Sequence, residues 1–120
     1  MNAAYLIGRA VFGGFFAYSG VNHFRHTQHM SGYTASKRVP SPDVAVLGSG
    51  AMLLVGGASL AAGVKPKLGA GLIAGFLATA TPMMHDFWNQ QDPTQRQNEM
   101  IHFMKNLALA GAAVAFMGER

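Results

Sequence analysis

The chain has 120 residues, of which 12% are charged and 50% hydrophobic, with a formal net charge of +4. This length suits one domain, and the charged fraction is well below the ~25% usual in soluble domains. The nine basic residues form no Lys/Arg-rich run that could follow a phosphate backbone, which excludes nucleic acid as a partner. The chain has no cysteine, so disulfides, thiolate metal sites and dithiol relays are excluded as well.

Four segments are long and apolar enough, or nearly so, to cross a hydrocarbon core as helices of about 20 residues. They cover residues 3–24, 44–64, 68–88 and 101–117. Pro42, Pro66 and Pro93 lie at the breaks between them. The sequence therefore predicts an all-α membrane protein, a single domain over residues 1–120 that forms an antiparallel bundle of four transmembrane helices.

The first connection is the only long one, and residues 33–39 within it could form a short helix on the membrane surface. Gly71 and Gly75 form a GxxxG pattern, which lets two membrane helices approach closely. The alternative is that glycine is simply frequent here, with 15 copies in the chain.

The positive charge suits a lipid bilayer with anionic headgroups, and the distribution of basic residues bears on orientation. Lys65 and Lys67 stand in a very short loop against two helix ends, which favours a cytoplasmic location for that side. Glu119 and Arg120 belong to the same side and look like ordinary headgroup anchors. We therefore expect a multi-pass protein of the bacterial cytoplasmic (inner) membrane with both termini in the cytoplasm.

Alternating spans place the ends of the first and third helices at the same membrane face as the starts of the second and fourth. All five histidines of the chain fall on that face. The candidate ligand-binding residues of this polar end are His23, His85, Asp86, Trp88, His102, Lys105 and Asn106. Trp88 would supply an aromatic wall, and Lys105 or a histidine would donate a hydrogen bond to a ligand carbonyl.

Lys105 lies about one turn inside the fourth span, where an unpaired charge costs at least a few kcal/mol. The sequence favours Asp86 as its partner, because Asp86 enters from the same face on the preceding helix. Such a pair could pin the two helices together, form part of a ligand site, or do both.

Arg9 belongs toward the opposite face, where it could extend to the headgroups or point inward and bind an anionic or carbonyl-bearing ligand. Haem between two histidines is disfavoured, because His23, His85 and His102 lie near the interface rather than at mid-depth. Glu99 and His102 have Glu-x-x-His spacing, but no second such pair faces them, so no metal site is predicted.

Several motifs together resemble the DoxX family of small bacterial four-helix membrane proteins. They are Gly8-Arg9, Tyr18-Ser19-Gly20, Asn22-His23-Phe24, residues 36–42, Gly56-Gly57, His85-Asp86-Phe87-Trp88 and residues 103–109. The family is named for its similarity to the membrane subunit of a thiosulfate:quinone oxidoreductase, and some members are associated with oxidative-stress defence. The resemblance implies the fold and the membrane location, and it suggests a redox or quinone connection, whereas the lack of cysteine excludes direct thiol exchange.

Three functions remain open on the sequence. The first is a membrane subunit or accessory factor of a redox system, quinone-linked or related to oxidative stress, that binds a small amphipathic ligand such as a quinone at the polar end. The second is a small transporter or permeability factor that works as a homo-oligomer. The third is a scaffold that docks a soluble or membrane oxidoreductase. No catalytic residue is identified, and we expect the chain not to be an enzyme on its own.

Overall fold

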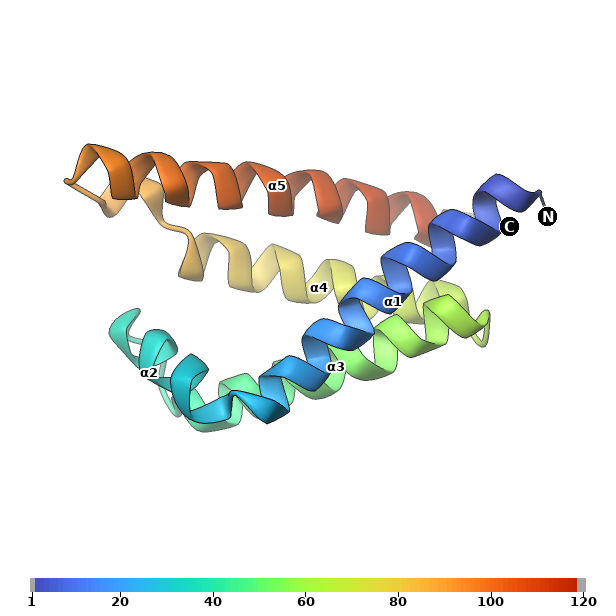
Figure 1. Cartoon of the computed structure of the whole chain (residues 1–120), viewed down its shortest axis with the longest axis horizontal. Helices are drawn as coiled ribbons and strands as arrows, with labels where there is room; N and C mark the ends of the chain where they lie inside the picture. Colours follow the sequence, from blue (N-terminus) through green and yellow to red (C-terminus); the bar gives the residue numbers. More distant parts are fainter. Residues whose placement is uncertain (1, 119–120) are drawn as a thin grey trace.

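The computed structural model describes residues 2–118, which form five α-helices and one short 3-10 helix joined by turns (Figure 1). The elements are α1 (Ala3–Arg25), α2 (Thr27–Ser36), α3 (Pro42–Ala62), α4 (Pro66–Met84), η1 (Phe87–Asn89) and α5 (Pro93–Met117). The terminal residues Glu119 and Arg120, expected to anchor in the headgroups, lie outside the described residues.

Local sequence explains where several helices begin and end. The side chain of Asn2 accepts a hydrogen bond from the Tyr5 amide at the start of α1, and Asp92 accepts one from the Gln95 amide at the start of α5. Helices α3, α4 and α5 each have a proline in the first turn, where its missing N–H costs nothing. Gly63 ends α3 with a left-handed φ of 78°, which favours glycine.

The helices pack in the order α1, α3, α4, α5, each against the next, and α2 packs on α3. The core lies along this row and consists of Phe16, Leu53, Leu60, Ala70, Ile73, Leu77 and Ala113. At the end where α1 begins and α5 finishes, the two outer helices also meet through Tyr5 and Phe12, which contact Phe116. Toward the other end they diverge, and α2 lies there opposite the end of α4 and the start of α5 (Figure 1).

Helices α1 and α3 cross at very short range through glycines spaced seven residues apart on each helix. A Cβ at Gly13 would come within 2.7 Å of the Gly57 carbonyl oxygen, and one at Gly20 would come within 2.7 Å of the Gly50 carbonyl oxygen. Real Cβ atoms do not come so close to backbone, so these positions accept only glycine without a shift of the helices. This contact fixes α1 alongside α3.

Three helical segments are long and apolar enough to cross a membrane, namely Pro42–Ala62, Pro66–Asn89 and Pro93–Met117. Only 6% of the most apolar window of α5 is buried inside the protein. Water would be a poor environment for its exposed Ile101, Met104 and Leu107, whereas lipid tails would cover them favourably. The predicted count of four spans is not confirmed by this measure, because α1 is not among these segments.

The structure differs from the sequence predictions in several details. The GxxxG pattern does not mediate a close helix contact, because a Cβ at Gly75 would meet nothing within 4 Å and one at Gly71 only the tip of Met117 at 3.9 Å. Helix α2 begins six residues earlier than the predicted residue 33 and ends at Ser36. Helix α4 ends at Met84 rather than at residue 88, and α5 begins at Pro93 because Asp92 and Pro93 together form a good helix start.

Candidate functional site

A pocket of about 640 Å³ lies between α2, α3 and α4, at the end where the bundle opens. Its walls are mostly apolar, with a few polar side chains among methionine, alanine, valine and phenylalanine. From α1, α2 and the following loop it is lined by His23, His29, Met30, Tyr33, Thr34 and Val39. From α3 it is lined by Ala45, Val46, Ser49 and Met52, and from α4 and its end by Gly75, Phe76, Thr79, Ala80, Met83, Met84 and His85.

Gly75 contributes to the size of this pocket. A Cβ at Gly75 would meet no heavy atom within 4 Å, so the space above it is open. The four methionines in the lining have flexible, polarizable side chains that can adapt to ligands of different shape. The pocket is therefore suited to an apolar or amphipathic molecule of modest size.

Next to the pocket residues Tyr33 and His85, an ion pair connects the end of α2 with the segment that follows α4. The Lys37 ammonium lies 2.7 Å from Oδ1 of Asp86, and the two side chains are only 11% and 19% exposed. Asn89 and Gln90 also donate hydrogen bonds to the Asp86 carboxylate, at 3.1 and 3.4 Å. Asp86 is thus held by three donors, which makes this contact stronger than an isolated surface pair.

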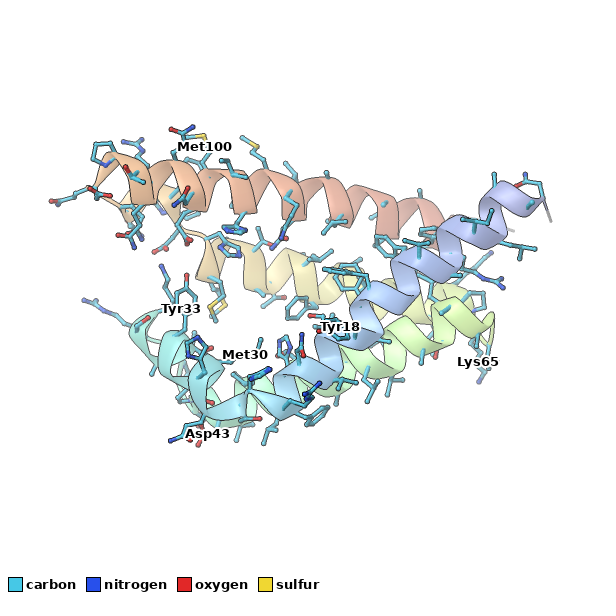
Figure 2. The ribbon with its side chains drawn as sticks, viewed as in Figure 1. Tyr18, Met30, Tyr33, Asp43, Lys65 and Met100 are labelled. Carbon is cyan, nitrogen blue, oxygen red and sulfur yellow. The ribbon has the colours of Figure 1, made fainter. Side chains whose placement is uncertain are left out.

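Tyr33 makes the second connection across the pocket edge, and Figure 2 shows it reaching from α2 toward the end of α4 and toward α5. Its hydroxyl donates to the Met84 carbonyl oxygen at 2.8 Å and lies 3.3 Å from Oε2 of Glu99. The same carboxylate oxygen lies 3.4 Å from Nδ1 of His85, whose ring stacks on His102 with centroids 5.1 Å apart. The polar cluster, defined as Tyr33, Lys37, His85, Asp86, Glu99 and His102, thus joins α2, α4 and α5.

The electrostatics of α2 agree with this geometry. Burial and the neighbouring Glu99 carboxylate raise the pKa of Tyr33 above its usual 10.0, which keeps its hydroxyl protonated. Burial alone would lower the pKa of Lys37, but the hydrogen bond to Asp86 and the nearby charges outweigh it and raise the pKa above 10.5. At neutral pH, therefore, Tyr33 is a hydrogen-bond donor and Lys37 is a cation.

The comparison with protein families identifies the chain. The family model for DoxX matches residues 4–86. The chain belongs to the DoxX family. The matched part contains α1 to α4 and reaches His85 and Asp86, whereas α5 lies outside it. No curated protein and no solved structure matches the chain.

In this DoxX-family membrane protein, the predicted site residues fall into separate groups. His85, Asp86 and His102 belong to the polar cluster, and His23 and His85 both line the pocket. Trp88 lies apart from the pocket lining, because its ring packs on Phe87 and Phe103. Lys105 is exposed and Asn106 half-buried on α5, and neither lines the pocket.

The predicted partnership of Asp86 with Lys105 is wrong, because Asp86 is paired with Lys37. The sequence prediction considered only the four spans, whereas α2 brings a cation from the first connection to the same place. Tyr33 and Lys37 were therefore not among the predicted site residues. Their spacing of four residues places them on one face of a helix, and Lys37 also belongs to the motif of residues 36–42, so these two signals could have indicated them.

Arg9 lies at the other end of the bundle, beside the turn that ends α3. A Cβ at Gly63 would come within 2.7 Å of an Nη atom of the Arg9 guanidinium, and the guanidinium also lies over the Tyr5 ring at 5.7 Å. This position is distant from the pocket along α1. Among residues 2–118, no group of three or more His, Asp or Glu side chains is arranged to hold a metal ion.

Proposed function

We propose that this DoxX-family protein binds a small amphipathic ligand, such as a quinone or its reduced form, and acts as an accessory factor or membrane subunit of a redox system. The observation that carries this proposal is the apolar pocket of about 640 Å³ beside the polar cluster. A ligand with an apolar body and a polar head would match the two environments. The redox connection itself is supported by the family resemblance alone.

The proposal includes a topology of four spans, α1, α3, α4 and α5, with α2 at the membrane surface. Helix α1 is 23 residues long and lies along α3 from the Gly13–Gly57 contact to the Gly20–Gly50 contact. Two helices in such contact share the same depth, so α1 crosses the membrane if α3 does. Arg9 then lies level with the end of α3, close to the headgroups, where its charge is tolerated.

The proposed location is the bacterial inner membrane, with both termini in the cytoplasm. The start of α1 and the end of α5 lie at the same end of the molecule (Figure 1), as four crossings require. Lys65, in the short turn between α3 and α4, lies at that end too (Figure 2), where the cytoplasmic surface would attract it.

A substitution that fills the pocket with a larger side chain tests whether the ligand binds there. Gly75→Leu should introduce a side chain into the pocket, since Gly75 lines it and a Cβ at this position meets nothing within 4 Å. Binding of an alkyl benzoquinone and of its hydroquinone would be measured by equilibrium dialysis on the protein in lipid nanodiscs. We expect Gly75→Leu to weaken binding at least tenfold.

Gly111→Leu is the matched control, because Gly111 lies on α5, away from the pocket lining, and its Cβ also meets nothing within 4 Å. This variant should bind as the wild type does. Equal binding by both variants, or no saturable binding by the wild type, would refute the pocket as the ligand site.

A further inference from the structure

Most polar side chains of the pocket donate their proton in a hydrogen bond to another group of the protein. The hydroxyls of Ser49 and Thr79 donate to the carbonyl oxygens of Val46 and Gly75 on their own helices, at 3.1 and 2.9 Å. Thr34 donates in the same way to the Met30 carbonyl oxygen, at 2.8 Å. A hydroxyl has one proton, so each of these oxygens retains only acceptor capacity.

His23 likewise uses a ring proton in a hydrogen bond within the protein. Its Nδ1 lies 2.8 Å from the Ser19 carbonyl oxygen, which can only accept, so Nδ1 carries the proton. In a neutral imidazole the other nitrogen, Nε2, is then an acceptor. The ring also packs edge to face on Phe76 at 6.0 Å, which fixes it at the pocket wall.

The remaining pocket residues with polar side chains are Tyr33, His85 and His29. Tyr33 gives its proton to the Met84 carbonyl oxygen, and the Nδ1 proton of His85 is directed at the Glu99 carboxylate when that histidine is neutral. His29 is the exception, because it is exposed and either ring nitrogen is available to solvent or ligand. Six of the seven polar side chains in the lining thus offer acceptors and no free donor.

From this pattern we infer that the pocket selects ligands that donate a hydrogen bond, such as phenols, hydroquinones or other hydroxyl-bearing amphiphiles, over their ketone, quinone or ether counterparts. The inference rests on the proposed function, since it specifies the ligand class of the same pocket. It also reverses the sequence-based prediction, in which the protein donated a hydrogen bond to a ligand carbonyl. A carbonyl ligand can donate to none of the acceptors of His23, Ser49 and Thr79, whereas a hydroxyl can donate to one of them, and this one hydrogen bond favours the hydroxyl.

A pair of ligands that differ only in whether the ring oxygen carries a hydrogen or a methyl group tests this inference. The probes are 4-hexylphenol and 4-hexylanisole, which share the ring, the alkyl chain and the acceptor oxygen, whereas only the phenol can donate. Binding to the full chain in nanodiscs would be measured by equilibrium dialysis and corrected for partition into empty nanodiscs. We expect the phenol to bind about 3- to 10-fold more tightly, the range that one neutral hydrogen bond provides.

The His23→Phe variant tests the contribution of one acceptor. Phenylalanine keeps a ring against Phe76 but removes one of the six acceptors, so the advantage of the phenol should shrink while the anisole binds as before. Retained anisole binding also shows that the variant is folded. His26→Phe, at an exposed position outside the pocket lining, is the matched control and should keep the preference for the phenol.

The outcomes distinguish this inference from the proposed function. Both probes could bind to the wild type and bind more weakly to Gly75→Leu. If the anisole then binds the wild type as tightly as the phenol does, the ligand class is refuted, while the pocket remains the binding site. If neither probe binds in a manner sensitive to Gly75→Leu, the proposed function itself fails.

Discussion

At the scale of single residues, the ion pair between Lys37 and Asp86 joins the first connection to the end of α4, with 2.7 Å between the ammonium and the carboxylate oxygen. The sequence favours Lys105 as the partner of Asp86, because Lys105 lies inside a predicted span, where a charge needs a partner. The position of Lys37 depends on how the first connection packs on α3 and reaches toward the end of α4, and no short-range pattern encodes that path. The tertiary structure therefore determines that Lys37, and not Lys105, pairs with the Asp86 carboxylate.

Replacing Lys37 with glutamine should destabilise the protein, because it leaves the largely buried Asp86 carboxylate without its cation. The Asn89 and Gln90 hydrogen bonds to Asp86 remain, so we expect a loss of about 1 to 2 kcal/mol rather than the larger cost of an isolated buried charge. The measurement is the free energy of unfolding in detergent, from a denaturant titration followed by circular dichroism. Lys105→Gln, at an exposed position, should change this value by less than about 0.5 kcal/mol.

The difference in stability between the wild type and Lys37→Gln should also depend on pH, and the direction of this dependence is predictable. The pKa of Lys37 is raised above 10.5 in the folded protein, so the stabilisation is fully present below pH 10.5 and is lost as the pH rises through the folded value. The difference in stability between the wild type and Lys37→Gln should therefore be constant at neutral pH and disappear in strong alkali. A difference that persisted there would mean that packing of the lysine stem, not its charge, is responsible.

At the scale of helices, the positions of the apolar segments were predictable and the contacts between them were not. Length, hydropathy and proline breaks located four long helices to within a few residues at most ends. The glycine pattern chosen from the sequence, Gly71 and Gly75, proved to border open space. Close packing uses Gly13 and Gly20 of α1 and Gly50 and Gly57 of α3, which share a seven-residue spacing. Fifteen glycines offer many such spacings, and only the tertiary arrangement selects the pair that faces another helix.

Gly20→Ala should destabilise the α1–α3 contact, because the new Cβ would come within 2.5 Å of the Leu54 amide nitrogen and 2.7 Å of the Gly50 carbonyl oxygen. Backbone cannot move aside as a side chain can, so we expect a loss of about 1 to 3 kcal/mol, as for other overpacked sites. Gly14→Ala on the same helix meets nothing within 4 Å and should be neutral or slightly stabilising, since alanine is the better helix former. Thermal unfolding of both variants in one detergent tests the prediction, which fails if the two melt alike.

At the scale of the whole molecule, the polar end was predictable and the pocket was not. Alternation of spans placed His23, His85, Asp86 and His102 at one end without any knowledge of packing. The pocket depends on the divergence of α1 from α5 and on α2 lying across the gap, and these are properties of the assembled bundle. The hydrogen-bond character of its lining follows in turn from individual backbone contacts that a sequence does not reveal.

The number of crossings is the remaining property of the whole molecule, and it has a direct readout. If α1 crosses the membrane beside α3, the chain crosses four times and both termini lie on one side. If α1 does not cross, the three apolar segments leave the termini on opposite sides. Fusions of a fluorescent protein active only in the cytoplasm and of a phosphatase active only in the periplasm, at each terminus in turn, separate these cases. We expect fluorescence and no phosphatase activity from both termini, and a split result between the two ends would exclude four spans. Deleting residues 3–25 provides the control, since the two termini should then lie on opposite sides of the membrane if α1 had crossed.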